Sequence, residues 1–164
     1  MDITEDQKQY ILDTAKRITD LMSIECQFEV RETGADDGQM IHLAIYTQDN
    51  ASFLIGRDGQ TVKDFEHILR AMINKKFYSD GQKAGPSLVL DINDYRKTRM
   101  NYLVDVAKQA VGRVRSTQKA EALFPMSAYE RRVVHMELAA CPDVATESIG
   151  EGLQRRIVIK PYTI

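Results

Sequence analysis

The segment Gly-x-x-Gly at 56–59 is the feature that most constrains the fold, because it separates a short apolar run at 51–55 from a long amphipathic stretch ending near residue 76. Glycine is used where a backbone turns tightly or approaches another backbone closely. We therefore expect two helices joined by this turn, with Thr61 available to cap the second one. Such a turn is either a plain connection between helices or a place where N–H groups at a helix start face a phosphate.

The sequence before this turn predicts one helix and two strands. A capping box at 4–7 and apolar residues at helical spacing predict an amphipathic helix over 5–22. Alternating apolar and polar residues predict strands around 26–30 and 41–45, with a polar turn at 34–38 between them. We expect the two strands to form a hairpin.

The sequence after the turn predicts a long helix and a third strand. The apolar face of that helix consists of Val62, Phe65, Leu69, Met72 and Ile73. Turn residues at 79–81 and 85–86 are expected to end the helix and frame a loop. Alternation over 88–92 predicts the last strand, after which 93–94 can cap another helix.

The predicted order is helix, strand, strand, helix, turn, helix, strand, and it resembles the bacterial type II K-homology (KH) domain. That resemblance implies three strands backed by three helices, and a Gly-x-x-Gly loop that clamps about four nucleotides of a single strand. It also implies that Arg57 contacts phosphate and that Ile55 and Val62 line an apolar groove for bases. The implied loop site comprises Ile55, Gly56, Arg57, Asp58, Gly59, Gln60 and Thr61.

Charge is distributed unevenly along the 164 residues, although the net charge is only −2. Residues 1–93 contain 10 Lys and Arg against 16 Asp and Glu, whereas residues 94–164 contain 12 against 8. The bias is strongest within 94–119, where Asp94 and Asp105 oppose seven cations: Arg96, Lys97, Arg99, Lys108, Arg113, Arg115 and Lys119. This segment is either a solvated helix face or a source of sequence-independent attraction to phosphate.

The second half of the chain predicts two helices and three short strands. Apolar residues at helical spacing extend the basic segment as a helix to about residue 116. A short strand at 121–124 is followed by a capping box at 127–130, which opens a helix over 129–140. Segments 145–149 and 155–160 are then expected to form a hairpin.

Arg131 and His135 are separated by three residues, so their side chains leave the same helix face one turn apart. A guanidinium fork suits phosphate oxygens, and an imidazole can donate a hydrogen bond or stack on a base. Taken alone, such a pair is more often structural. The segment 124–138 closely resembles the signature of the R-3-H domain, a single-stranded nucleic-acid-binding module, as do the Thr-Glu-Ser-x-Gly segment at 146–150 and the strand at 155–161.

A type II KH domain followed directly by an R-3-H domain resembles the Jag family, also called SpoIIIJ-associated proteins. The resemblance implies an α+β protein with a KH domain over 1–93 and an R-3-H domain over 94–164. We expect the chain to lack the separate N-terminal Jag-N domain that many family members carry. Asp58 also departs from the family, whose Gly-x-x-Gly loops commonly hold basic residues. The expected contacts in the second domain are Arg131, Arg132, His135, Arg113 and Arg115.

These patterns favour a binding protein over an enzyme. The sequence contains no P-loop, its three histidines fall in different predicted elements, and Cys26 and Cys141 have no metal-ligand spacing, so we expect no cofactor, no metal and two reduced thiols. The acidic N-terminus and the lack of a long apolar run predict a cytoplasmic protein without membrane insertion. The expected ligand is single-stranded RNA, with single-stranded DNA as the alternative.

The family resemblance links the chain to cell elongation, division or sporulation in bacteria. A different hypothesis is an adaptor that pairs through its KH surface with another small KH protein or with a second copy, with RNA secondary or absent. The net charge of −6 over residues 1–93 and the carboxylate of Asp58 motivate this hypothesis, because both repel phosphate.

Overall fold

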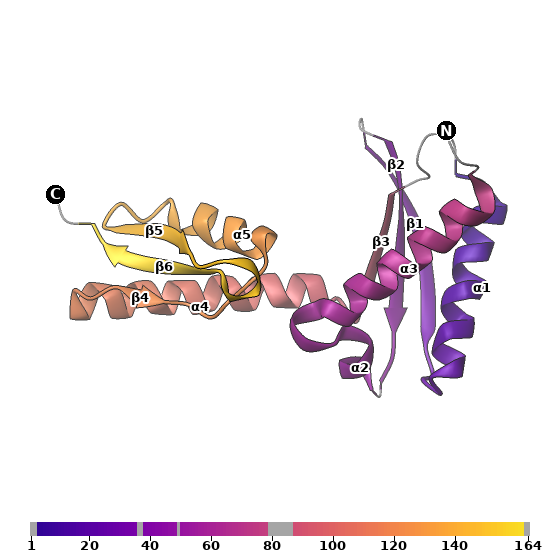
Figure 1. Cartoon of the computed structure of the whole chain (residues 1–164), viewed down its shortest axis with the longest axis horizontal. Coiled ribbons are helices and arrows are strands. Elements are labelled where there is room, and N and C mark those ends of the chain that lie inside the picture. The colour runs from indigo at the N-terminus through magenta and orange to yellow at the C-terminus, as the bar shows by residue number, and fades with distance from the viewer. Residues whose placement is uncertain (1–2, 36–37, 49, 79–86, 163–164) are drawn as a thin grey trace. The chain divides into compact units, whose positions relative to one another are not determined.

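The computed structural model describes residues 3–35, 38–48, 50–78 and 87–162 and shows an α+β protein. The chain divides into two compact units, Met1–Arg96 and Lys97–Ile164. Each unit contains helices and one three-stranded sheet (Figure 1). This architecture confirms the predicted fold class. The units are described separately below.

The first unit contains α1 (Glu5–Leu21), β1 (Gln27–Ala35), β2 (Gly38–Tyr46), α2 (Ala51–Ile55), a 3-10 turn at Arg57–Gly59, α3 (Gln60–Phe77) and β3 (Ser87–Ile92). Its sheet has the order β1-β2-β3. The hairpin pair β1–β2 is antiparallel, as predicted, whereas β2 and β3 are parallel. Three helices therefore accompany three strands in the order expected of a type II KH fold.

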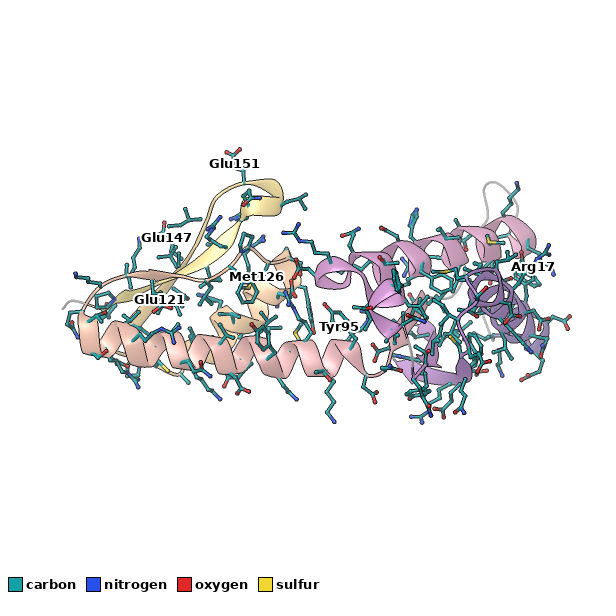
Figure 2. The ribbon with its side chains drawn as sticks, turned by 90° about the horizontal axis from the view of Figure 1, so that it is seen from below. Arg17, Tyr95, Glu121, Met126, Glu147 and Glu151 are labelled. Atoms are coloured by element: carbon teal, nitrogen blue, oxygen red, sulfur yellow. The ribbon has the colours of Figure 1, made fainter. Side chains whose placement is uncertain are left out.

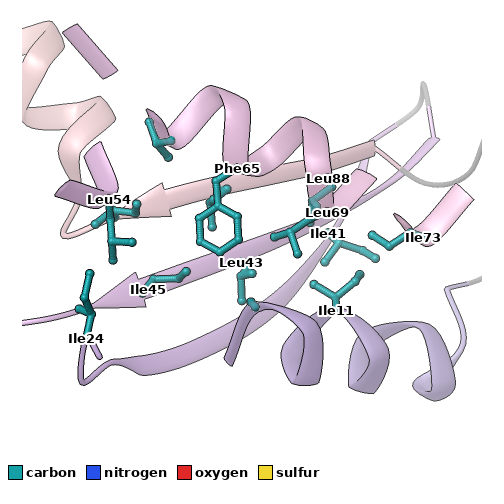
Figure 3. Packing of buried hydrophobic residues seen from close by; sticks show 14 of the residues in the cluster. Ile11, Ile24, Ile41, Leu43, Ile45, Leu54, Phe65, Leu69, Ile73 and Leu88 are labelled. Carbon is teal, nitrogen blue, oxygen red and sulfur yellow. The ribbon is translucent and has the colours of Figure 1, made fainter. Parts of the chain in front are cut away.

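The core of the first unit forms because alternate strand residues face the helices. Ile41, Leu43 and Ile45 of β2 are fully buried and lie in register with Leu88, Leu90 and Ile92 of β3. Ile11 of α1 and Leu69 of α3 pack into the same cluster (Figure 3). Full burial of each aliphatic side chain contributes about 1.5–3 kcal/mol, so period-two burial fixes the register of this sheet.

Several details of the first unit differ from the prediction. Within the polar turn expected at 34–38, Gly34 and Ala35 instead belong to β1, and Gly38 begins β2. Met72 was expected on the apolar face of α3 but is 38% exposed. The turns predicted at 79–81 and 85–86 lie outside the described residues.

The second unit contains most of α4 (Tyr95–Thr117), then β4 (Glu121–Ala122), α5 (Ala128–Leu138), β5 (Val144–Ile149), a 3-10 turn at Gly152–Gln154 and β6 (Arg156–Pro161). The sheet has the order β4-β6-β5, and both of its strand pairs are antiparallel. Buried residues of α4, α5 and β6 form one hydrophobic cluster, which includes Val114, Val134 and Ile159. The predicted basic helix, short helix and hairpin are all confirmed.

The helix starts confirm two predicted caps and correct a third. Both capping boxes form, at Thr4 with Gln7 and at Ser127 with Glu130. Residues 93–94 were expected to cap α4, but the Asn93 side chain instead accepts from the N–H of Thr47 and donates to the Thr47 carbonyl. The Asp91 carboxylate accepts the N–H of Arg96 in the first turn of α4. Asn93 thus binds the backbone at the end of β2, and sequence spacing alone could not indicate this contact.

Cys26 and Cys141 are free, half-buried thiols, as expected. Burial raises the pKa of Cys26, which keeps that thiol protonated and unreactive near neutral pH. Among the helices in the described part of the chain, none combines the length and the hydropathy required to span a bilayer.

Candidate nucleic-acid interface

The Gly-x-x-Gly loop is a tight turn whose shape depends on both glycines. Gly56, Asp58 and Gly59 all have positive φ, at 71°, 53° and 74°. A β-carbon on Gly56 would lie 2.8 Å from the backbone nitrogen of Thr61 and still closer to its side chain. A β-carbon on Gly59 would lie 2.6 Å from the ring of Tyr95. Neither position can therefore hold a larger residue without rearrangement of the loop.

The loop uses some of the N–H groups that were expected to face a ligand. The N–H of Gly59 donates to the Gly56 carbonyl at 3.3 Å, and the N–H of Gln60 donates to the Arg57 carbonyl. Thr61 does not cap α3, because Gly59 is the N-cap and Thr61 lies within the first turn of the helix. The loop therefore presents fewer backbone donors than the sequence predicted.

The exposed side chains of the loop carry opposite charges. The Arg57 side chain is 97% exposed, and its Nε lies 3.9 Å from Oδ2 of Asp58. Gln60 is also exposed and donates to Asp64. Ile55 is half-buried against the core, and Val62 is only 3% exposed. The expectation that Val62 lines a groove for bases is therefore wrong, because this side chain belongs to the core.

Replacing Gly56 with alanine is expected to lower the free energy of unfolding of the first unit by about 1–3 kcal/mol, because alanine at positive φ is strained and meets Thr61. Urea denaturation followed by circular dichroism measures the change. Asp58→Gly is the matched control, since glycine accepts the left-handed backbone there, and it should change stability by less than about 1 kcal/mol. Equal losses for the two variants would contradict this account of the loop.

The second predicted site lies on α5, where Arg131 and His135 are one turn apart. Nη1 of Arg131 donates to the Met126 carbonyl at 2.6 Å. Nδ1 of His135 shares a hydrogen bond with Oγ1 of Thr146 on β5, at 2.5 Å. Arg132 is exposed, and the described part of the structure gives its side chain no hydrogen-bond or ion-pair partner. Neutral oxygen atoms thus hold the side chains of Arg131 and His135, whereas Arg132 faces solvent.

The basic residues of α4 are mostly paired with carboxylates, which the charge count did not anticipate. Five of the seven form ion pairs: Arg96 with Glu66, Arg99 with Glu130, Lys108 with Glu137, Arg113 with Glu121, and Arg115 with Asp143. Hydrogen bonding from Arg113 lowers the pKa of Glu121, and Arg115 does the same to Asp143. Of the predicted interface residues, Arg113 and Arg115 therefore present less net charge than expected.

The ion pair between Arg99 and Glu130 is the most buried of these five pairs, and the sequence analysis did not predict it. Nε of Arg99 donates to Glu130 at 2.9 Å, and the two side chains are only 15% and 7% exposed. The guanidinium of Arg99 also lies 5.3 Å from the ring centroid of Phe124, which stacks with Tyr102. The capping box identified Glu130, but nothing in the sequence linked it to a residue 31 positions away.

Burial alone would raise the pKa of Glu130, but hydrogen bonds from Arg99 and Ser127 outweigh burial and lower it. Glu130 is therefore ionised at neutral pH and holds the start of α5 against α4. Because Arg131 and His135 follow on α5, this pair positions the helix that carries both residues.

Residues 101–161 match the family model of the R-3-H domain, so the second unit is an R-3-H domain. The chain is also similar to proteins named RNA-binding protein KhpB from three bacteria. It is 33% identical to the Clostridium symbiosum protein over 111 residues, 32% identical to the Bacillus subtilis (strain 168) protein over 115 residues, and 32% identical to the Lactiplantibacillus plantarum protein over 106 residues. These alignments cover 68%, 69% and 65% of this chain.

The fold and these similarities together confirm the predicted resemblance to the Jag family. The matched segments correspond to 48%, 53% and 31% of the three relatives. The chain thus spans about half the length of two of these relatives and about a third of the other.

Proposed function

We propose that this protein binds single-stranded RNA without catalysing a reaction, and that the α5 face of the R-3-H domain supplies most of the attraction. The observation that carries the proposal is the contrast between α4 and α5. Arg113 and Arg115 are matched with carboxylates, whereas Arg131 and His135 are held by a carbonyl and a hydroxyl. The carbonyl that holds Arg131 orients its guanidinium without cancelling the charge. The printed names of the three relatives also support RNA as the ligand.

The geometry suggests how each α5 residue would act. A guanidinium carries five N–H donors, so the bond from Arg131 to Met126 fixes the fork and leaves other donors for phosphate oxygens. The bond between Nδ1 of His135 and Thr146 leaves Nε2 as the nitrogen that can meet a ligand. Arg132 would add long-range attraction from the exposed side of the helix.

The first unit would mainly position the RNA and would contribute less to the attraction. In this proposal the backbone at Gly56 and Gly59 approaches the sugar-phosphate chain, and Arg57 contacts phosphate. The carboxylate of Asp58 offsets part of that attraction. Two weak sites on one chain raise the effective concentration of each for the same RNA, so modest affinities at each site suffice.

A salt titration of the whole chain tests the proposal. Fluorescence anisotropy with labelled single-stranded RNA should show binding whose logarithmic affinity falls linearly with the logarithm of salt concentration. Competition with DNA of the same sequence distinguishes RNA from single-stranded DNA, because contacts to the 2′-hydroxyl favour RNA. If random RNA pools show no salt-dependent binding, the proposal is wrong.

An adaptor function is the second candidate, and the exposed carboxylate of Asp58 within the loop favours it. The variant Asp58→Asn separates the candidates, because asparagine also tolerates positive φ but does not repel phosphate. If the loop contacts RNA, affinity for RNA should rise about threefold to tenfold, as expected for removal of one nearby like charge. Unchanged affinity, together with a complex between the chain and a small KH protein in sedimentation experiments, would favour the adaptor.

We further propose that the protein acts in the bacterial cytoplasm, in post-transcriptional regulation linked to cell elongation, division or sporulation. This part of the proposal is supported by the Jag-like resemblance. Crosslinking of the protein to RNA in cells, followed by mapping of the crosslinked residues, tests it. Crosslinks should fall on α5 and on the loop at 56–59.

A further inference from the structure

We infer that Arg155 is an additional RNA contact and that Ser148 is its positioning residue, so that the site extends from α5 onto the β5–β6 hairpin. This inference rests on the proposed function and adds a residue that neither the sequence motifs nor the family match singled out as a contact. Arg155 is exposed and lies directly before β6. Its Nε donates to Oγ of Ser148 at 3.0 Å.

The strand register places this bond on the same face of the sheet as the bond that holds His135. Ser148 pairs with Ile157 and Thr146 pairs with Ile159, and both isoleucines face the buried core beneath the helices. Two hydroxyls on one face of β5 therefore hold the His135 ring and the Arg155 guanidinium. Because they are two residues apart, they are separated by about 7 Å along the strand. That separation lets the imidazole and the guanidinium contact different groups of one bound chain.

A backbone connection links Arg155 to Arg131. The Met126 carbonyl accepts the bond from Arg131, and the Met126 N–H donates to the Arg155 carbonyl at 3.1 Å. Met126 is labelled in Figure 2, in the segment that leads into α5. Arg131 and the backbone of Arg155 are therefore anchored at the same residue.

The charges around Arg155 also favour an anionic ligand. Like Arg131 and His135, Arg155 is oriented by a neutral oxygen atom, and no ion pair of the described residues includes it. Glu151 projects outward from the tip of the hairpin (Figure 2). Glu147 lies on the opposite face of β5, where it pairs with Lys160. The Arg155 charge is thus available to phosphate.

Arg156 provides a matched control one residue away. It pairs with Ile149, so its side chain leaves the face of the sheet opposite Ser148. Among the residues that the structure describes, its guanidinium also donates only to neutral oxygens, those of Gln154. Arg155→Gln and Arg156→Gln therefore remove the same charge from the same hairpin but from different faces.

The test is RNA binding by the whole chain at several salt concentrations. Arg155→Gln should weaken binding about tenfold and reduce the salt slope by about one, as expected for loss of one charged phosphate contact. Arg155→Lys should retain the slope, and Ser148→Ala should weaken binding with the slope retained, because the charge stays but loses its orientation. Arg156→Gln should leave both quantities close to wild type. Circular dichroism confirms that each variant is folded.

The outcomes separate this inference from the proposed function. If the wild-type chain binds RNA but Arg155→Gln behaves like Arg156→Gln, the added contact is wrong and the proposed function stands. If Ser148→Ala leaves affinity unchanged while Arg155→Gln weakens it, the positioning role of Ser148 is wrong. If the wild-type chain binds no RNA, both fail.

Discussion

Replacing Glu130 with alanine is expected to lower the free energy of unfolding of the R-3-H domain by about 3–5 kcal/mol, the usual cost of removing one partner of a buried ion pair. The variant leaves the buried guanidinium of Arg99 without this carboxylate. It also removes the bond from Glu130 to the N–H of Ser127, which completes the capping box. Hydrogen exchange measured by mass spectrometry resolves the effect, because peptides from 97–164 report on this unit alone.

Two variants show whether the buried charge is responsible. Glu130→Gln can keep the capping box but not the charge, so its loss of stability should lie between those of wild type and Glu130→Ala. Glu137→Ala breaks the more exposed pair with Lys108 and should have a much smaller effect. Similar losses for Glu130→Ala and Glu137→Ala would show that burial of the pair is unimportant.

The same pair predicts a dependence on pH. Because the pKa of Glu130 is lowered in the folded protein, its carboxylate contributes stability above its unfolded pKa of about 4.3. That contribution is lost as the pH falls from this value through the lower folded pKa. The stability difference between wild type and Glu130→Gln should therefore be constant near neutral pH and shrink under acidic conditions. A difference that grows toward acid would contradict the ionised state assigned to Glu130.

The double variant Arg131→Gln/Arg132→Gln is expected to weaken RNA binding about 100-fold and to reduce the salt slope by about two, since it removes two phosphate-directed charges. The physical reason is that neither guanidinium is matched by a carboxylate among the described residues. Anisotropy titrations over a range of salt concentrations measure both quantities. Because Arg131 also bonds to Met126, thermal unfolding of the variant is measured in parallel.

A charge-matched double variant controls for net charge. Lys108→Gln/Lys160→Gln removes the same charge from the same domain, but both lysines are paired, with Glu137 and Glu147. This variant should change affinity far less than the Arg131 and Arg132 variant. Equal losses would mean that overall charge, and not the α5 face, drives binding. The variant Arg113→Gln/Arg115→Gln should fall between the two if the predicted α4 contacts contribute.

Features encoded within a few residues could be predicted from the sequence. The capping boxes at 4–7 and 127–130 depend on residues three apart, and alternation over 88–92 matches the burial of β3. For the same reason Arg131 and His135 could be placed on one helix face. The tight turn expected at 56–59 also follows from local composition, although the left-handed conformation of Asp58 does not.

Features that depend on distant residues could not be predicted. The charge count treated the cations of α4 as a basic surface, yet Arg115 meets a carboxylate 28 residues later and Arg99 meets one 31 residues later. Asn93 had the composition of a helix cap, but its partner Thr47 lies 46 residues earlier. Tertiary contacts therefore decide the partners of these polar side chains, and local sequence patterns do not reveal those partners.

The parallel pairing of β2 with β3 also affects the order in which the chain can fold. The β5–β6 hairpin joins strands separated by a short turn, whereas β3 can reach β2 only after α2, the loop at 56–59 and α3 have brought it back across the sheet. Closing such a long connection costs more chain entropy before any contact compensates it, so the pairing is intrinsically slower. We therefore expect β3 to pair with β2 late in folding. The loop at 56–59, which would position RNA, lies within the connection that must close in this slow step.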